Sequence, residues 1–327
     1  MPNKSALMRF LTTTENRSAL TAIEGLLHEL TSYVATNPLY LHGPTGTGKT
    51  HLARVLADEA IRLGCSICTL SANDFAEREA FTLPAEANDA DVLIVEDLQH
   101  LPTRFVDTLV SLIDQRVANE RPLVCTALCG PGQLNHRGVA FPNRLTTRLA
   151  AGLVVAIEPL GAPSRRRLLD QIADANHVKI ADDILAWLAT QLTGGGRQLT
   201  GAIVQLKELQ RLQKKPLQLD DVRAHFHAQI EATALTVARI TEHVGACYCV
   251  QPKQLRSAKR SREVLLPRQI SMYLARQLTK LSLQKIGHYF GGRDHKTVLH
   301  ACQKVTAAIK SDRALSGTVC RLRAELA

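Results

Sequence analysis

Apolar residues between positions 35 and 157 fall into short runs separated by longer helical stretches. In order, the runs are NPLYLHG, SICTLS, ADVLIVED, RPLVCTA and GLVVAIEP. Apolar segments that alternate with amphipathic helices are typical of a parallel sheet with helices on both faces. We therefore expect an α/β core in this part of the chain.

The pattern becomes helical after EPLGAPS, whose prolines and glycine interrupt the alternation. Helical periodicity then continues to residue 232, with a break at TGGGR (193–197), and residues 220–246 are predicted as one long helix. We expect three domains: an α/β core over 1–160, an all-α lid over 161–232 and an all-α domain over 233–327.

The segment GPTGTGKT (43–50) has the full G-x-x-x-x-G-K-[ST] spacing of a phosphate-binding loop. An apolar strand precedes it and a helix, HLARVLADEAIRLG, follows it. Glycines let backbone N–H groups face phosphate oxygens at the helix N-terminus. A glycine-rich turn without a ligand is the weaker alternative. The predicted nucleotide-binding residues are Gly43, Gly46, Gly48, Lys49 and Thr50, with Lys49 on the β- and γ-phosphates and the Thr50 hydroxyl on Mg²⁺.

Two carboxylates, Glu96 and Asp97, end the apolar run in DVLIVEDLQHL (91–101). The apolar residues predict a buried strand, so carboxylates at its C-terminal end would face a metal at the phosphate site. An acidic turn exposed to water is the alternative. We expect Glu96 to bind Mg²⁺ and both residues to act in hydrolysis.

Three arginines are candidates for contact with a nucleotide. Arg144 and Arg148, in NRLTTRLAAGL (143–153), precede a predicted strand. Ring- and filament-forming ATPases place an arginine here on a neighbouring subunit's γ-phosphate. Arg197 begins a helix in the all-helical section and could fold back onto the nucleotide. Taken alone, each also fits a surface arginine.

The composition narrows the class of protein. Of the 327 residues, 45% are hydrophobic but only 4% are aromatic, which predicts an aliphatic core. No apolar run approaches the roughly 20 residues of a membrane span, and the N-terminus has no apolar signal sequence, so we expect a soluble, cytoplasmic protein. Cys65 and Cys68 form a C-x-x-C, but no second pair completes a zinc site, and their context predicts a buried strand.

Positive charge is concentrated at the C-terminal end. Residues 235–327 hold 17 Lys and Arg against 5 Asp and Glu, a net charge of +12, whereas residues 1–234 hold 23 against 25. A basic section joined to a near-neutral one is typical of nucleic-acid binding. A merely soluble basic surface would not require this segregation.

A helix-turn-helix is predicted within the basic section. SLQKIGHYF (282–290) has helical periodicity, GGR follows as a tight turn, and a second helix runs from Asp294, which can cap its start. One face of the second helix is apolar, and the opposite face carries His295, Lys296, His300 and Lys304. In this motif the first residues of the second helix contact base edges in the major groove.

A basic loop precedes this motif. SAKRSREVLLPRQ (257–269) places Lys259, Arg260 and Arg262 before a proline that is predicted to begin the next helix. Such a loop beside a helix-turn-helix is suited to phosphate and minor-groove contact.

Several motifs, in this order, resemble the bacterial chromosomal replication initiator DnaA family: GPTGTGKTHLA, RLTTRLAAGLVVAIEP, LPRQISMYLARQLT and IGHYFGGRDHKTVLHACQKV. The resemblance spans roughly residues 9 to 310. It implies an AAA+ fold, use of ATP and Mg²⁺, self-association in the ATP state, binding of short double-stranded origin boxes and contact with the replicative helicase.

Individual positions also match the family. Arg148 matches an interfacial arginine finger, Arg144 a neighbouring motif arginine, and Arg197 the lid arginine that senses nucleotide. In the C-terminal domain the resemblance implies DNA contacts by Arg260, Arg262, Arg268, Arg293, Asp294, His295, Lys296 and Thr297.

The sequence also departs from the family pattern. Glu96 replaces an Asp, Leu128 stands near Thr126 where a polar sensor is expected, and Lys296 replaces a small residue. The stretch 74–90 is shorter than usual, and the N-terminal partner-binding domain is expected to be absent. These departures leave a DnaA-related DNA-binding regulator, with ATP as a ligand switch, as an alternative to an initiator. A helicase-loader-like ATPase fits less well because a loader needs no basic C-terminal domain.

Overall fold

The computed structural model describes residues 10–30, 37–74, 85–136, 139–213, 216–233, 235–248, 250–258, 261–279 and 281–326. The chain divides into two compact units: unit 1 comprises residues 1–136 and 141–232, and unit 2 comprises residues 233–327 with 137–140. Apart from residues 137–140, the stretches predicted as core and lid lie within unit 1. In the described part of the chain, no helix is long and apolar enough to cross a membrane.

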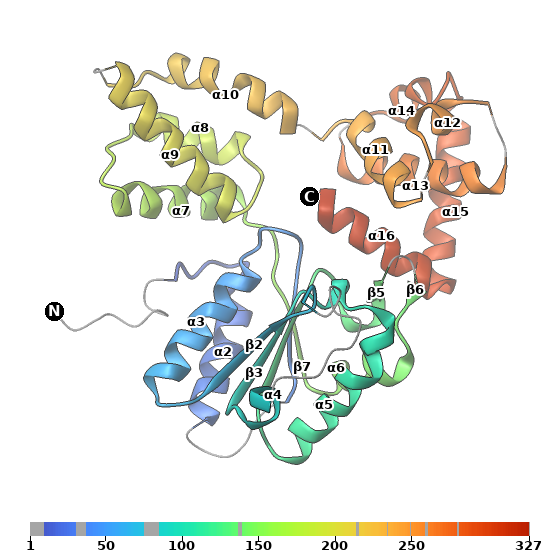
Figure 1. The fold of residues 1–327 in the computed structure, drawn as a ribbon. Helices are drawn as coiled ribbons and strands as arrows, with labels where there is room; N and C mark the ends of the chain where they lie inside the picture. The colour runs from blue at the N-terminus through green and yellow to red at the C-terminus, as the bar shows by residue number, and fades with distance from the viewer. Residues whose placement is uncertain are drawn as a thin grey trace. The chain divides into compact units, whose positions relative to one another are not determined.

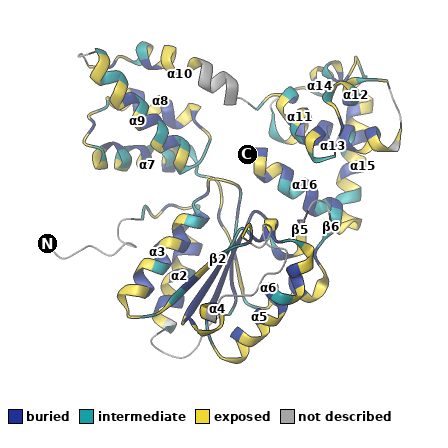
Figure 2. Cartoon of the chain, viewed as in Figure 1, coloured by how far each residue is buried: buried dark blue, intermediate teal, exposed yellow. Residues whose placement is uncertain are grey.

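Unit 1 is built on a five-stranded parallel sheet with the order β2-β3-β4-β1-β7. Its strands are β1 (Leu39–His42), β2 (Ile67–Ser71), β3 (Val92–Glu96), β4 (Leu123–Ala127) and β7 (Leu153–Ala156). Each strand lies in one of the five apolar runs, which confirms the predicted α/β core. The inner strands are buried (Figure 2), and the carboxyl ends of neighbouring β1, β4 and β3 meet at one edge.

Helices cover both faces of this sheet (Figure 1). On one face lie α2 (Arg17–Glu29) and α3 (Lys49–Arg62), which share an aliphatic core with the strands. The other face is covered by α4 (Ala85–Asp89), α5 (Val106–Ala118) and α6 (Asn143–Ala151). Short 3-10 helices span Leu98–His100, Thr103–Phe105 and Pro131–Gln133, and two short strands are β5 (Asn135–His136) and β6 (Val139–Ala140). Aliphatic side chains therefore build this core, as the composition predicts.

Four helices follow the sheet: α7 (Ala162–Ala175), α8 (Asp182–Gln191), α9 (Gly196–Gln213) and α10 (Leu219–Thr233). They share a second aliphatic core. The prediction of one helix over 220–246 is wrong, because α10 ends at Thr233 and α11 begins at Val237. The Thr236 hydroxyl accepts a hydrogen bond from the Arg239 N–H at 3.1 Å, so it caps α11 and starts a new helix.

The described part of unit 2 is helical apart from β6: α11 (Val237–Cys247), α12 (Pro252–Arg256), α13 (Arg262–Leu278), α14 (Leu283–Tyr289), α15 (His295–Ser311) and α16 (Arg313–Leu326). α11 and α13–α16 surround one apolar core. Pro267 was predicted to begin a helix but lies inside α13, which starts five residues earlier. Because proline has no N–H, α13 lacks the backbone hydrogen bond that residue 267 would otherwise donate to the carbonyl oxygen of Glu263.

Candidate nucleotide and DNA sites

The segment between β1 and α3 is a glycine loop at the carboxyl edge of the sheet. Gly46 and Gly48 have φ of 84° and 98°, a backbone region that favours glycine. A Cβ on Gly43 would lie 2.2 Å from the carbonyl oxygen of Ile157. Glycine is therefore required at each of these three positions, either by conformation or by space.

Lys49 is the first residue of α3, and only 7% of its surface is exposed. Its Nζ donates to the carbonyl oxygens of Gly43 at 2.7 Å and Pro44 at 2.9 Å. Burial lowers the pKa of Lys49 to about 8, and the carboxylate of Asp97 opposes part of this shift. An anion in the loop would relieve the cost of burying this charge. The loop therefore has the composition, shape and charge of a phosphate site.

Glu96 and Asp97 follow the buried part of β3 at the same edge. Oε1 of Glu96 is buried and, among the described residues, has no hydrogen-bond partner. A buried carboxylate oxygen without a partner is costly unless a cation or a donor meets it. Thr50 follows Lys49 in α3 and is partly buried. A carboxylate and a hydroxyl are oxygen ligands of the kind that Mg²⁺ takes, so Glu96 and Thr50 fit a metal site.

The carboxyl ends of β3 and β4 are joined by a residue that sequence reasoning missed, Gln99. Leu128 is buried and offers no polar side chain, and Thr126 accepts a hydrogen bond from the Asp97 N–H at 3.0 Å. Gln99, only 5% exposed, contacts both Asp97 and Leu128. A buried glutamine directly after an acidic strand end was the available signal.

The predicted finger, Arg148, and the neighbouring Arg144 lie on α6 and pair with α5. Arg144 contacts Asp107, and Nε of Arg148 lies 2.5 Å from Oδ1 of Asp114. Arg148 also donates to the carbonyl oxygen of Arg144 at 3.0 Å. The structure therefore places both guanidinium groups in exposed ion pairs along α5. Exposed pairs of this kind are weak, typically under about 1 kcal/mol, so a phosphate could displace the carboxylates.

The lid reaches the phosphate loop through backbone rather than side chains. Cα of Gly195 lies 3.1 Å from where a Cβ on Gly46 would be, and a Cβ on Gly195 would lie 1.9 Å from the Gly46 carbonyl oxygen. Arg197, two residues later, is exposed in the first turn of α9. The start of α9 therefore lies beside the loop, and Arg197 projects from that start.

A second contact joins the lid to the N-terminal segment. Oε1 and Oε2 of Glu15 accept hydrogen bonds from the Gly161 N–H at 2.7 Å and the Ser164 hydroxyl at 2.8 Å. Partial burial acts to raise the pKa of Glu15, but these hydrogen bonds outweigh it and lower the pKa to about 2. Glu15 thus fixes the start of α7.

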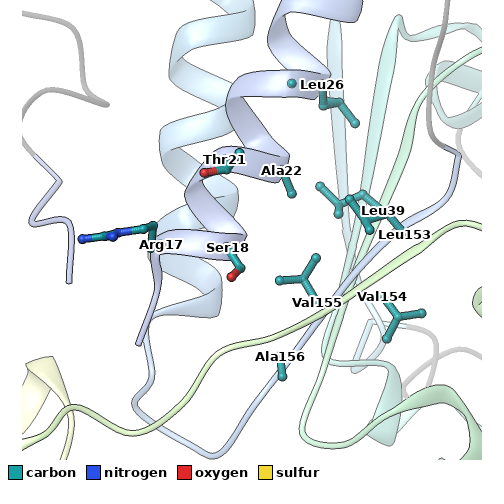
Figure 3. A pocket seen from close by; sticks show the side chains of 11 residues that line it. Arg17, Ser18, Thr21, Ala22, Leu26, Leu39, Leu153, Val154, Val155 and Ala156 are labelled. Atoms are coloured by element: carbon teal, nitrogen blue, oxygen red, sulfur yellow. The ribbon is translucent and has the colours of Figure 1, made fainter. Parts of the chain in front are cut away.

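A cavity of about 750 Å³ lies away from the phosphate loop, between α2 and the edge strand β7 (Figure 3). Its lining is largely apolar and includes Leu26, Leu153 and Val155, with Arg17 and Thr21 from α2. None of the predicted site residues lines it. The chemistry of the loop, rather than cavity volume, identifies the candidate nucleotide site.

In unit 2, α14 and α15 form the predicted helix-turn-helix. Gly291 and Gly292 have φ of 87° and 72°, and a Cβ on Gly287 would lie 2.1 Å from the carbonyl oxygen of Arg293. Glycines therefore permit both the turn and the close approach of the two helices.

The first turn of α15 presents polar residues to solvent. His295, Lys296 and Thr297 are all exposed. Asp294 occupies the N-cap position, but its side chain makes no cap hydrogen bond, contrary to the prediction. Its Oδ1 instead lies 2.6 Å from Nδ1 of His295. This contact orients the ring so that Nε2 faces away from the carboxylate.

Arg268 departs from its predicted role in contacting DNA. It is 2% exposed, and its guanidinium donates to the carbonyl oxygens of Leu255 at 2.6 Å, Gln254 at 3.0 Å and Ser257 at 2.9 Å. A side chain buried in this way cannot reach a duplex while the fold is intact. Arg268 instead holds the segment that leads into the basic loop.

The structure describes the side chain of only some of the other residues predicted to contact DNA. Arg293 is half-buried and donates to the Ser257 carbonyl oxygen at 2.8 Å, so it shares this partner with Arg268. Arg260, with Lys259, lies outside the described residues, as does the side chain of Arg262. The described part of the predicted DNA interface therefore consists of the start of α15 and residues 254–257, where carbonyl oxygens accept hydrogen bonds from Arg268 and Arg293.

A P-loop core with a helical lid, joined to a helix-turn-helix, defines a nucleotide-dependent DNA-binding protein of the AAA+ class. Residues 2–156 match the model of the bacterial DnaA ATPase domain, and residues 237–305 match that of the bacterial DnaA helix-turn-helix. The chain belongs to the DnaA family of chromosomal replication initiators, and it has an ATPase domain that binds nucleotide and a domain that binds DNA.

Curated relatives agree with this assignment. The chromosomal replication initiator protein DnaA of Levilactobacillus brevis is 30% identical over 312 residues, which cover 90% of this chain and 67% of that protein. The Mesorhizobium japonicum DnaA is 31% identical over 326 residues, which cover 94% and 66%. The chain spans about two thirds of the length of these relatives.

Solved structures share the fold. AMPPCP-bound DnaA from Aquifex aeolicus has a TM-score of 0.59 at 23% identity, covering 99% of this chain and 96% of that one. A replication initiator DnaA bound to AMPPCP and single-stranded DNA has a TM-score of 0.56 at 22% identity, covering 100% and 99%. The Thermotoga maritima RuvB branch migration motor is more distant, with a TM-score of 0.51 at 15% identity, covering 91% and 88%.

Proposed function

We propose that the protein is a replication initiator that binds ATP with Mg²⁺, self-associates in the ATP state and binds double-stranded origin boxes through α15. One observation carries the proposal: a phosphate loop with a buried Lys49, whose pKa is lowered, and a helix-turn-helix with an exposed basic first turn occur in the same chain. The first provides a nucleotide switch, and the second provides a duplex reader.

In the nucleotide site, residues of the chain would bind and orient the phosphates. The loop N–H groups and Lys49 would hold the β- and γ-phosphates, and Arg197 would approach from α9. Thr50 and Glu96 would hold Mg²⁺, which neutralises charge on the phosphate oxygens when it is bound. Asp97 would accept a proton from the attacking water.

Self-association would follow from the exposed arginines of α6. If Arg148 and Arg144 exchange their α5 carboxylates for the phosphates of a second copy, ATP would favour a head-to-tail assembly. Such heterologous contacts produce open helices when they do not close into a ring. Contact with the replicative helicase is the remaining part of the proposal, and it rests on family membership.

In unit 2, the exposed residues at the start of α15 would enter the major groove. A long cation at Lys296 can reach guanine O6 and N7 or a phosphate, whereas a small residue would contact a thymine methyl group. We therefore infer that this protein prefers a box that differs from the usual one of its family.

Duplex opening tests the proposal. Boxes would first be selected from random duplex DNA with ATP, and an array of the selected box beside an AT-rich segment would then be probed with a single-strand-specific nuclease. An initiator opens the segment with ATP and fails to do so with ADP or after Arg148→Ala. Binding to the box without opening under any nucleotide would instead establish a DNA-binding regulator. The shortened stretch 74–90 favours that alternative, whereas the replacements at Glu96 and Leu128 alter the hydrolytic site and lead us to expect slow ATP turnover.

A further inference from the structure

A buried glutamine links the carboxyl ends of β3 and β4 beside the phosphate loop. Gln99 lies two residues after Asp97, and its Nε2 donates to Oδ1 of Asp97 at 3.0 Å. Its Oε1 accepts from the Leu128 N–H at 3.2 Å. A backbone N–H can only donate and a carboxylate can only accept, so these partners fix which end of the amide faces each of them.

The backbone of Asp97 is held as well. Its φ of 58° and ψ of 48° are in the left-handed region, which is uncommon for residues other than glycine. The N–H of Asp97 donates to the fully buried Oγ1 of Thr126 at 3.0 Å. Hydrogen bonds and the β4 backbone thus form a closed ring through Asp97, Gln99, Leu128 and Thr126. Strained backbone persists where its surroundings determine it in this way, and such places cluster at functional sites.

The ring holds a carboxylate whose charge reaches the phosphate loop. The charge of Asp97 acts on Lys49, whose Nζ lies against the loop carbonyls. With one carboxylate oxygen tied to Gln99, rotation of the Asp97 side chain is restricted. The other oxygen can then be presented to a water molecule in one direction. The apolar Leu128 side chain supplies no such tie, and only its backbone N–H takes part.

We propose that Gln99 is a positioning residue for ATP hydrolysis, acting through Asp97. The inference rests on the proposed function. In the reaction the oxygen of water bonds to the γ-phosphorus, and the bond between that phosphorus and the bridging β–γ oxygen breaks. The electron pair of that bond leaves with ADP, and the water proton passes to the carboxylate of Asp97. Gln99 contacts neither water nor phosphate and sets only the direction of the carboxylate.

Gln99→Glu in the full-length protein separates positioning from folding. The introduced carboxylate still accepts from the Leu128 N–H but no longer donates to Asp97. We expect the single-turnover rate with radiolabelled ATP to fall by about 10- to 100-fold. This is less than the roughly 100- to 10,000-fold contribution of a general base, because Asp97 is retained and loses only its orientation. The Kd for ATP should stay within about threefold, because phosphate binding belongs to the loop and Lys49.

A second variant gives a second readout. Gln99→Met removes both hydrogen bonds and adds no charge, so it should be as slow as Gln99→Glu while its Kd for ATP also stays within about threefold of wild type. Gln191→Glu makes the same chemical change as Gln99→Glu at an exposed position at the end of α8 and should hydrolyse ATP like wild type.

Thermal unfolding of each variant monitors the fold. A wild-type rate in Gln99→Glu and Gln99→Met, with normal ATP binding, overturns the inference. So does a rate loss in both variants that is matched by an equal loss of ATP binding and parallels their loss of stability. A wild-type protein that binds ATP but does not hydrolyse it also overturns the inference while leaving the ATP switch intact. Failure of the wild type to bind ATP overturns the proposed function and the inference together.

Discussion

Replacing Arg268 tests whether it braces unit 2 or contacts DNA. Arg268→Met keeps most of the side-chain volume but removes the donor to three carbonyl oxygens. The bond to Leu255 is buried, whereas those to Gln254 and Ser257 are partly buried and can be replaced by water. One unsatisfied buried acceptor costs about 1–3 kcal/mol, and each partly buried one costs about half a kcal/mol more. We expect unit 2 to lose about 2–4 kcal/mol of stability.

The assay compares Arg268→Met with Lys296→Met. Calorimetry of the full-length protein should show the unfolding temperature of unit 2 lowered by about 10 °C or more in Arg268→Met, because a domain of this size shifts by about 4–8 °C per kcal/mol. Lys296 is exposed, so its replacement should change stability by at most about 0.5 kcal/mol.

Salt dependence supplies the discriminating measurement. Fluorescence anisotropy with a random-sequence duplex gives the slope of log affinity against log salt, which falls by about 0.9 for each phosphate contact removed. Well below its unfolding temperature, Arg268→Met should retain the wild-type slope, whereas Lys296→Met loses up to one contact. An Arg268→Met protein that unfolds at the wild-type temperature but has a slope reduced by about one would refute the bracing role and place the guanidinium on DNA.

Three further outcomes are expected in unit 1. With a pKa of about 8 for Lys49, the unfolding free energy should rise between pH 8 and 10.5, because the unfolded state binds more protons there. ATP binding near pH 9 should take up close to one proton, which calorimetry detects as a binding heat that depends on the buffer. Lys49→Met should show no such proton uptake. Gly195→Ala should weaken ATP binding at least about tenfold, because its Cβ would meet the Gly46 carbonyl oxygen. Gly201→Ala, which has open space around it in α9, should bind ATP normally, and its free energy of unfolding should rise by up to about 1 kcal/mol. Because the pKa of Glu15 is about 2, the stability advantage of wild type over Glu15→Gln should be complete above pH 4.5 and disappear as the pH falls to about 2 in thermal unfolding.

The sheet and the phosphate loop could be predicted because their signals are local. A run such as VLIV needs burial wherever it occurs, and the glycines at 46 and 48 follow from the backbone turn that joins β1 to α3. The end of α10 was missed because a helix pattern continues through residues 234–236 while the Thr236 side chain caps α11. The boundary between α10 and α11 depends on the hydrogen bond that the Thr236 hydroxyl accepts, and hydrophobic periodicity does not predict such a bond.

Partners of individual polar side chains were beyond prediction. Arg268 lies in a basic sequence, and its charge gave no sign that carbonyl oxygens of residues 254–257 would surround it. Gln99 looked like an ordinary residue after a strand, because its role depends on the end of β4, 29 residues away. In both cases the contact joins segments that are distant in sequence, and residue type alone does not select among the available partners.

The phosphate loop and the lid are coupled by their geometry in unit 1. Lys49 is buried at an energetic cost that an anion relieves, so nucleotide binding supplies free energy at this point. The same loop contacts Gly195 directly through backbone, and backbone atoms in contact cannot yield as a flexible side chain does. Glu15 fixes the start of α7 by two hydrogen bonds, so the lid is held at a second point near its beginning. We therefore expect a loop that rearranges around phosphate to move the start of α9 while α7 stays held. ATP would then set the position of Arg197, and the lid rather than the sheet would distinguish ATP from ADP.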